Sequence, residues 1–179
     1  MRLHDLANLI EIAVNTQYPH PDILHMTGEY YQPYYYLMYL LASQAGCDGD
    51  IVELGVSKGY GVNSFAYGDP DVKVIGLDLN VEPDSTLPNV EFHLISALPV
   101  PDFINKIEIL HIDTEHNYDN ALNEFNQYKP YLLPGAIVMF DDLHAADNGV
   151  LRAFYELPYA KIQEDKLHPV CGYGVLIYE

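Results

Sequence analysis

The sequence predicts an α/β fold, in which a mostly parallel β-sheet is covered by helices on both faces and ends in an antiparallel pair of strands. Short apolar runs alternate with segments of helical periodicity through most of the chain, the pattern of a parallel sheet with crossover helices. The last two apolar runs are joined by too few residues for a crossover helix, so they should pair antiparallel. The 179 residues, 49% of them hydrophobic, suffice for one domain with a full core.

The N-terminal region should be helical. Residues 3–14 place apolar side chains at a helical period. Residues 33–43 form a second expected helix, which Pro33 begins and which ends near Gly46. We therefore expect a helical cap of residues 1–46 on a core of residues 47–179, within a single domain of residues 1–179.

Seven strands and three more helices should follow the cap. The expected strands are residues 51–55, 72–78, 90–95, 107–113, 133–142 (opened by a turn), 159–165 and 172–179, and the expected helices are residues 62–68, 117–128 and 149–157. The connection from Asp78 to Val90 is too short and too rich in proline for a full helix. Ligands of such sheets bind at the carboxyl ends of the strands, so polar residues at those ends are the candidate site.

The charge of the chain narrows the choice of ligand. Only 8 Lys and Arg oppose 26 Asp and Glu, giving a formal net charge of −18. This surface repels phosphate backbones and has no basic stripe, so nucleic acid is excluded as a substrate, whereas a bound cation would reduce the negative charge. Solubility alone is the simpler reading for most of the acids.

The sequence shows neither a membrane span nor a signal peptide, and this bears on the cellular location of the protein. It contains no apolar run long enough to span a membrane, and polar residues interrupt the N-terminal segment, unlike a signal peptide. Cys47 and Cys171 have neither metal-binding nor redox spacing. We expect them to be small packing residues in a reducing, cytoplasmic protein.

A glycine-rich loop follows the first expected strand. In VELGVSKGYG, residues 52–61, the glycines Gly55, Gly59 and Gly61 lie between a strand and a helix, where backbone can approach a ligand closely. Their spacing fits neither the dinucleotide fingerprint nor a P-loop. Glu53 is an acid inside a buried strand and needs a hydrogen-bond donor. Asp78 ends the next strand, where an acid can accept hydrogen bonds from ribose hydroxyls, so a nucleoside site is favoured over a simple turn.

The segment HIDTEH, residues 111–116, could be a metal site, an acid–base pair or a solvated turn. Asp113 closes one expected strand, and Asp141 and Asp142 close the next. These strand ends should be neighbours, and three carboxylates brought together would repel unless a divalent cation lay between them. Oxygen ligands suit Mg²⁺, with Mn²⁺ or Ca²⁺ as alternatives, whereas the simpler reading is that Asp141 and Asp142 cap the next helix.

These segments resemble a known family. VELGVSKGYG followed by GLDLN resembles the S-adenosylmethionine (SAM) site of class I methyltransferases. HIDTEHNYDNALNEFNQYKPYLLPGAIVMFDD is similar to a metal-dependent small-molecule O-methyltransferase subgroup, which includes macrolide-sugar O-methyltransferases, and catechol O-methyltransferase has a similar metal arrangement. The resemblance covers about residues 48–179. It implies a Rossmann-like, doubly wound, mostly parallel seven-stranded sheet with an antiparallel last hairpin.

The resemblance also implies roles for particular residues. SAM would be held by the glycine loop, by Asp78 at the ribose and by residues near adenine and the methyl group; the cofactor-binding set is Glu53, Gly55, Ser57, Gly59, Gly61, Asp78, Ser96, Ala97 and Asp113. The metal ligands would be Asp113, Asp141 and Asp142. His116 would be the general base that takes the proton from the acceptor hydroxyl. Relatives often have an acid where Ser96 and Ala97 stand, which leaves the adenine contacts undetermined.

Other polar and aromatic residues have competing interpretations. We expect His111 to be structural and His116 to be the base rather than a surface histidine, whereas His144 stays unassigned. Six tyrosines lie before the first strand: Tyr30, Tyr31, Tyr34, Tyr35, Tyr36 and Tyr39. They could stack on an aromatic or sugar acceptor, but an aromatic stripe at helical spacing more often packs in the core or contacts a second copy of the chain.

Two other functions compete with methyl transfer to a small-molecule hydroxyl. His111 and Asp113 with the distant His168 resemble the iron triad of oxygenases, although this would leave Asp141, Asp142 and the glycine loop without a role. A non-catalytic SAM-binding scaffold is the other alternative, because a fold alone does not fix function.

Overall fold

The computed structural model describes residues 1–16, 33–44, 46, 48–83, 86–145 and 147–179. The strands are β1 (Asp50–Leu54), β2 (Val74–Asp78), β3 (Val90–Leu94), β4 (Ile107–Ile112), β5 (Leu132–Phe140), β6 (Ala160–Gln163) and β7 (Gly174–Ile177). The α-helices are α1 (Leu3–Asn15), α3 (Pro33–Ala42), α4 (Tyr60–Gly68), α5 (Tyr118–Tyr128) and α6 (Gly149–Glu156), and a 3₁₀ turn, η2 (Lys129–Tyr131), precedes β5.

The strands form one seven-stranded sheet in the order β3-β2-β1-β4-β5-β7-β6. The first five strands are parallel, whereas β7 pairs antiparallel with both β5 and β6. This is the Rossmann-like, doubly wound sheet with an antiparallel last hairpin that the sequence predicts. Its order reverses between β1 and β4, the position where sheets of this kind bind ligands.

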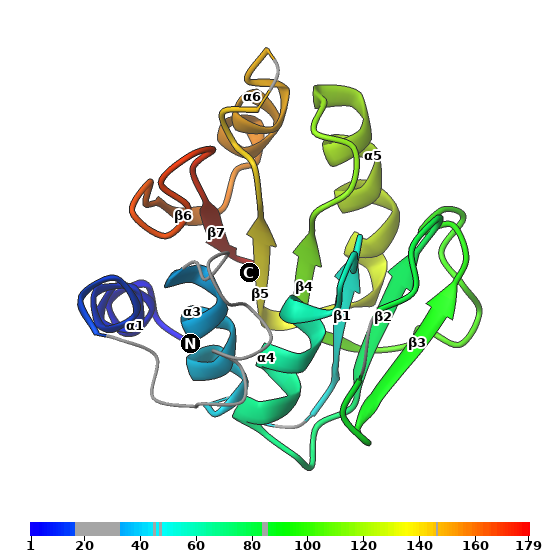
Figure 1. The fold of residues 1–179 in the computed structure, drawn as a ribbon. Helices are drawn as coiled ribbons and strands as arrows, with labels where there is room; N and C mark the ends of the chain where they lie inside the picture. Colours follow the sequence, from blue (N-terminus) through cyan, green and yellow to red (C-terminus); the bar gives the residue numbers. More distant parts are fainter. Residues whose placement is uncertain (17–32, 45, 47, 84–85, 146) are drawn as a thin grey trace.

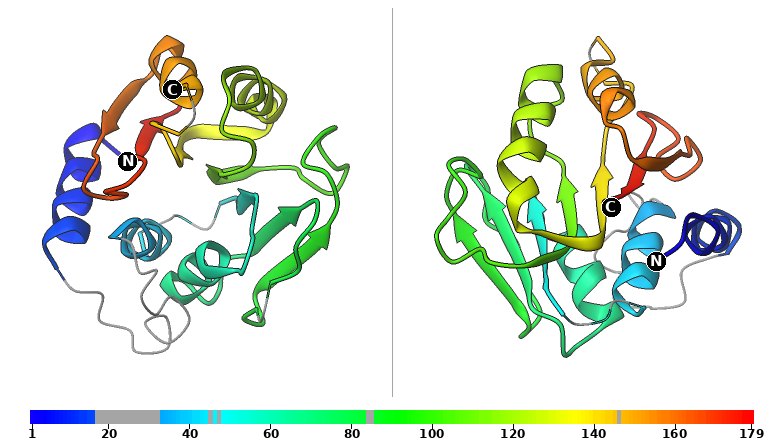
Figure 2. Two further views of the ribbon diagram at one scale, coloured as in Figure 1. Left: turned by 45° about the horizontal axis from the view of Figure 1, so that its top comes forward. Right: turned by 180° about the vertical axis from the view of Figure 1, so that it is seen from behind.

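Helices cover both faces of the sheet, as Figure 1 and Figure 2 show. Helices α3 and α4 lie on one face and α5 and α6 on the other, while α1 packs beside α3 and β6. Each face has its own buried core: Leu37 and Phe65 contribute to one, and Phe125 and Phe154 to the other. Because α1 and α3 bury apolar side chains in the same core as α4, the N-terminal helices form part of the layer that covers the sheet.

The expected elements all occur, with shifts at their ends. Helix α4 begins at Tyr60, two residues earlier than expected, because Gly59 adopts a left-handed φ of 88° and turns the chain directly into the helix. β2 begins at Val74 rather than residue 72, and Asp113, Asp141 and Asp142 lie just beyond their strands. Helix α5 begins after Asn117, whose side chain accepts a hydrogen bond from the backbone N–H of Asn120.

The remaining expectations about the chain have mixed outcomes. No helix lies between β2 and β3 in the described residues, as the short connection predicts. Among the helices that the structure describes, none is long and apolar enough to cross a bilayer. Tyr30, Tyr31 and Cys47 lie outside the described residues.

Candidate active site

The glycine loop between β1 and α4 is pressed against the end of β4. Gly55 has a φ of 83°, and a Cβ built on it would lie 1.9 Å from the carbonyl oxygen of Asp113. A Cβ on Gly61 would lie 1.9 Å from Oε1 of Glu53. Both positions therefore require glycine, and the loop brings backbone close to Glu53 and Asp113, as the sequence predicts for a ligand-binding loop.

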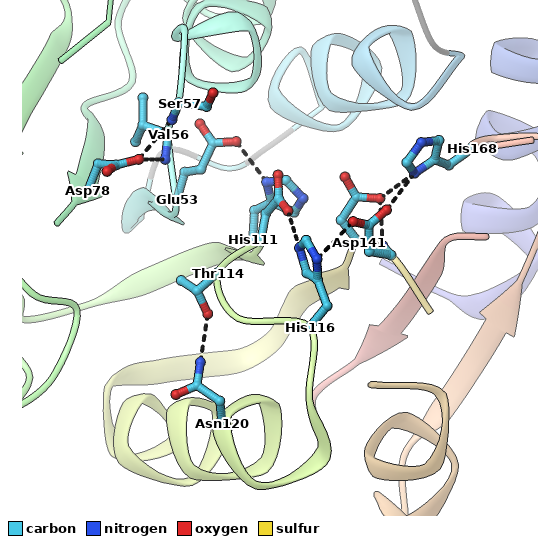
Figure 3. A network of polar contacts seen from close by, with 12 residues as sticks. Glu53, Val56, Ser57, Asp78, His111, Thr114, His116, Asn120, Asp141 and His168 are labelled. Atoms are coloured by element: carbon cyan, nitrogen blue, oxygen red, sulfur yellow. Dashed lines mark hydrogen bonds and ion pairs between the residues drawn. The ribbon is translucent and has the colours of Figure 1, made fainter. Parts of the chain in front are cut away.

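Asp78 fixes this loop from the end of β2. Its Oδ2 accepts hydrogen bonds from the backbone N–H groups of Val56 (3.0 Å) and Ser57 (2.9 Å), as drawn in Figure 3. Its Oδ1 accepts from the backbone N–H groups of Asn80 (2.8 Å) and Val81 (2.9 Å). Partial burial raises the pKa of Asp78, but these four bonds outweigh it and hold the pKa below its ordinary value. Asp78 is thus a brace for the loop, a role that the sequence did not suggest.

The buried acid of β1 has a histidine as its donor. Nδ1 of His111 lies 2.8 Å from Oε1 of Glu53, and both side chains are almost fully buried. Burial raises the pKa of Glu53, and the contact with the Glu53 carboxylate raises the pKa of His111 although burial opposes it. His111 thus has the hydrogen-bond partner that a structural role requires, and that role stays a prediction. Oε2 of Glu53 and Nε2 of His111 have no hydrogen-bond partner, so the pair has one spare acceptor and one spare ring nitrogen.

The ends of β4 and β5 meet in an acid–histidine cluster, which we define as Asp113, His116, Asp141, Asp142 and His168. Nε2 of His116 lies 3.2 Å from Oδ1 of Asp113, and its Nδ1 lies 3.0 Å from Oδ2 of Asp142. Nδ1 of His168 lies 2.8 Å from Oδ1 of Asp141 and 3.3 Å from Oδ1 of Asp142. Each of the three predicted metal ligands therefore contacts an imidazole of the cluster, and Figure 3 shows Asp141 with His116 and His168 on either side.

The electrostatics of the cluster follow from this alternation of acids and histidines. The bond to Asp113 raises the pKa of His116, and the bond to Asp141 raises the pKa of His168 against the effect of burial. Burial and the neighbouring Asp141 raise the pKa of Asp113. Asp142 adopts a φ of 53°, uncommon for a residue other than glycine, as is often found where backbone strain serves a site.

Candidate metal-ligand sets within the described residues combine acids with histidine or cysteine. Ligand atoms lie within 4.8 Å of one another in three groups: Asp113, His116 and Asp142; His111, Asp113 and Asp141; and Asp142, His168 and Cys171. The set of three carboxylates expected from the sequence is not among them, although Asp113 lies within this distance of Asp141 in one group and of Asp142 in another. The iron triad of His111, Asp113 and His168 is not assembled in the described part of the chain either.

Two cavities flank the glycine loop and share Asp113. The first, about 380 Å³, is lined by Glu53, Ser57, Gly61, His111 and Asp113, and by the tyrosines Tyr34, Tyr35 and Tyr60. The second, about 400 Å³, is lined by the end of β2, by residues after β3 and by α5; its lining includes Gly55, Asp78, Ser96, Ala97, Thr114 and Glu124. All of the predicted cofactor residues except Gly59 thus line one of two cavities that share Asp113, while Gly59 serves the turn into α4.

Residues 52–143 match a family described as a methyltransferase domain. The chain belongs to this methyltransferase family. A stretch of 51 residues is 39% identical to an uncharacterized protein of Acanthamoeba polyphaga mimivirus, and it covers 28% of this chain and 21% of that protein. The match thus spans about a fifth of the length of this relative.

Solved structures show the same fold across the whole methyltransferase. The TDP-rhamnose 3′-O-methyltransferase CalS11 of calicheamicin biosynthesis matches with a TM-score of 0.60 at 16% identity, covering 98% of this chain and 93% of that one. A putative O-methyltransferase from Klebsiella pneumoniae gives 0.61 at 15% identity, over 99% and 89%. An O-methyltransferase from Bacillus cereus in complex with SAH gives 0.55 at 15% identity, over 99% and 90%.

Sequence reasoning missed several participants in the site. His168 was considered only as an iron ligand and Cys171 only as a packing residue, yet both lie beside Asp142. Nothing local in the sequence places the loop before β7 against the end of β5. His144 contacts Asp165 at the surface, 3.1 Å away, rather than the cavities. Glu124, buried on α5 and bonded to Thr114, follows the helical period of that helix and could have been found from it.

Proposed function

We propose that this protein is a SAM-dependent O-methyltransferase that acts on a hydroxyl group of a small molecule with the help of a divalent cation. The observation that supports this most is the sharing of Asp113 by both cavities and by the acid–histidine cluster. A donor molecule lying along the glycine loop would place its reactive end beside the groups that can activate a hydroxyl.

The residues of the loop fit SAM. Gly55 and Gly61 leave room that any Cβ would fill, and Oε2 of Glu53 is a buried acceptor without a partner, suited to an ammonium group. On the other side of the loop, Ser96, Ala97 and Asn120 line a cavity wide enough for a nucleoside. Asp78 could meet ribose hydroxyls there only by giving up part of its bonding to Asn80 and Val81, because all four of its acceptor positions are used.

The cluster also fits a divalent cation. Asp113 and Asp142 both offer oxygen ligands within 4.8 Å of a ring nitrogen of His116, and Asp141 adds a third carboxylate through His168. Carboxylate oxygens are suitable ligands for both Mg²⁺ and Mn²⁺. The nearby imidazoles favour Mn²⁺ over Mg²⁺, because Mg²⁺ takes oxygen ligands. Bound in this place, the cation would lower the pKa of an acceptor hydroxyl, and SAM would supply the electrophilic methyl group.

His116 is the proposed general base. If both ring nitrogens of His116 donate to ionised Asp113 and Asp142, the ring is an imidazolium and cannot accept a proton. His116 becomes a base only when one of these contacts opens and that nitrogen is unprotonated. His116 would then take the acceptor proton, and bound SAM would supply the methyl group to the oxygen and leave as S-adenosylhomocysteine.

The acceptor is proposed to be a small, uncharged or cationic molecule. Tyr34, Tyr35 and Tyr60 line the first cavity, and Lys58 is the one lysine or arginine among the described residues of its lining. Tyr34 stacks on Tyr173 with ring centroids 4.9 Å apart, so its ring is already part of the core and leaves Tyr35 and Tyr60 to contact an acceptor. A net charge of −18 argues against nucleic acid and other polyanions.

Calorimetry with SAM, in the presence and absence of Mn²⁺ and Mg²⁺, tests the proposal first. Phenols, catechols and sugars are then assayed for production of S-adenosylhomocysteine, with and without EDTA. The proposal requires SAM binding and a methylated product whose formation falls in EDTA. Tight SAM binding without any product from the whole library would favour a non-catalytic SAM-binding protein, and equal turnover in EDTA would remove the cation.

A further inference from the structure

A second group of potential metal ligands shares Asp142 and His168 with the acid–histidine cluster and adds Cys171, which the proposed reaction does not use. Cys171 is a free, partly exposed thiol on the loop between β6 and β7. One ligand atom from each of Cys171, His168 and Asp142 lies within 4.8 Å of the others. This thiol group makes the set chemically different from one built of carboxylates and imidazoles.

The backbone holds His168 and Cys171 in a fixed turn. The N–H of Gly172 donates to the carbonyl oxygen of His168 at 2.8 Å, so one helical turn joins the two ligand-bearing positions. Gly172 has a φ of 74°, and a Cβ there would lie 2.5 Å from the ring of His144, so the turn packs tightly on the segment after β5.

The same turn is bonded to the segment that bears Asp142. The N–H of His144 donates to the carbonyl oxygen of Cys171 at 2.6 Å, and the N–H of Leu143 donates to that of Gly172 at 3.3 Å. Two strand-like contacts therefore fix the distance between Asp142 on one segment and the pair of His168 and Cys171 on the other. A site assembled by backbone contacts needs little rearrangement to receive an ion.

Asp142 also has binding capacity to spare. Its buried Oδ1 lies 3.3 Å from Nδ1 of His168 and has no hydrogen bond within ordinary distance limits. The thiol of Cys171 contacts the Asp142 carboxylate, and burial together with this contact raises the pKa of the thiol. Thiolate, imidazole and carboxylate are the ligands that Zn²⁺ takes in proteins, whereas Mg²⁺ and Ca²⁺ do not take a thiolate.

We infer that Asp142, His168 and Cys171 form a binding site for a thiophilic divalent cation such as Zn²⁺, next to the site proposed for Mg²⁺ or Mn²⁺. Three protein ligands leave a fourth position for water, the arrangement of an open zinc site. The two sites share Asp142, whose Oδ1 lies 3.3 Å from His168 and whose Oδ2 lies 3.0 Å from His116, so each site can use a different oxygen. The inference does not depend on methyl transfer, because its test reads the metal–sulfur bond directly.

Titration of the metal-free, full-length protein with Co²⁺, which replaces Zn²⁺ and absorbs light, tests this site. Binding to Cys171 produces a thiolate-to-cobalt charge-transfer band in the near ultraviolet, and addition of Zn²⁺ removes the band whereas excess Mg²⁺ leaves it. The band should disappear in Cys171→Ser and persist in Cys47→Ser, the matched control that alters the other cysteine of the chain. His168→Gln keeps the thiol, and there we expect at least ~10-fold weaker cobalt affinity.

Circular dichroism of each variant shows whether it is folded before the spectra are compared. Absence of the band in the wild-type protein, its persistence in folded Cys171→Ser or its loss in Cys47→Ser would each overturn the inference. If Cys171→Ser does not fold, His168→Gln decides alone: unchanged cobalt affinity in that variant contradicts the site.

Discussion

Asp78 and the carboxylates of the acid–histidine cluster lie at the same edge of one sheet, yet they are satisfied in opposite ways. Asp78 accepts four hydrogen bonds from backbone N–H groups, which cannot titrate or turn away. Asp113, Asp141 and Asp142 contact the side chains of His116 and His168, which can do both. The comparison separates a fixed half of the site, suited to holding a cofactor, from an exchangeable half, suited to a cation and a proton.

The largest effect is expected from breaking the exchangeable half. Asp141→Ala should abolish cation-stimulated turnover, because it removes a carboxylate at the end of β5, and should leave SAM affinity nearly unchanged. Turnover with and without the cation, and SAM affinity by calorimetry, are measured on the same preparation to check these two expected results. Asp102→Asn, at an exposed position, is the control. A parallel loss of SAM affinity would show that the two halves are not separate.

Replacing the proposed base should have the next largest effect. His116→Gln keeps a hydrogen-bonding side chain but cannot accept a proton at neutral pH, so kcat should fall about 10²- to 10⁴-fold. The pH dependence of kcat should also flatten in this variant. Steady-state kinetics from acid to alkaline pH provide the measurement, and unchanged turnover would remove His116 from the mechanism.

The fixed half can be tested through Gly61. In Gly61→Ala the new methyl group would lie 1.9 Å from Oε1 of Glu53, so the loop or the buried acid must move. We expect SAM affinity to fall at least ~10-fold, as a lost charged contact would require, and the protein to be destabilised. Gly46→Ala is the matched control, because a Cβ there has its nearest neighbour at 3.4 Å. Equal SAM affinity in the two variants would argue against this cradle.

A smaller loss is expected when the brace of the loop is weakened. Asp78→Asn replaces one acceptor oxygen by a donor group, leaving two backbone N–H groups without a good partner. The free energy of unfolding should fall by about 1–3 kcal/mol, which urea denaturation measures. If the loss appears only in SAM affinity and not in stability, Asp78 acts on the ribose rather than on the loop.

The smallest effect concerns stability against pH, where the two halves should differ in sign. Contacts with Asp113 and Asp142 raise the folded pKa of His116 above 6.5, so its stabilising contribution is full below that pH and is lost as pH rises through the folded pKa. The folded pKa of Asp78 is below 3.8, so its contribution is full above that pH and is lost as pH falls through the folded value.

Urea denaturation of the cation-free protein across this range gives the measurement. The decline in stability on the alkaline side should be weaker in His116→Gln, and the decline on the acid side should be weaker in Asp78→Asn. Identical pH profiles in the wild-type protein and in both variants would contradict the contrast between the two halves.

Much of the fold could be predicted because each element is encoded locally. The apolar runs at β1, β4 and β5 lie between turn residues, and α5 shows a clear helical period. The start of α4 was predicted too late because the left-handed turn at Gly59 depends on contacts of the loop rather than on periodicity. The hydrogen bonds from the loop to Asp78 could not be predicted for the same reason. They join Asp78 to Val56 and Ser57, which lie 22 and 21 residues earlier in the sequence.

The candidate site was predictable to the level of strand ends. Parallel topology brings Asp113 and Asp141 to one edge wherever the strands pair, so their proximity follows from order alone. Which side chains fill the space between them depends on packing: His116 lies on the loop before α5, and His168 lies on a loop 27 residues beyond Asp141. No periodicity encodes that distance, so the imidazoles of the cluster emerge only in three dimensions.

The position of β7 between β5 and β6 determines when the sheet can be completed during synthesis of the chain. A nascent chain that has emerged from the ribosome only as far as β6 can pair its parallel strands, but it lacks the strand that joins β5 to β6. His168 arrives with that same late segment. Newly made chains must therefore pass through a stage in which Asp141 and Asp142 lack this imidazole, and the acid–histidine cluster is completed only once translation has gone past His168.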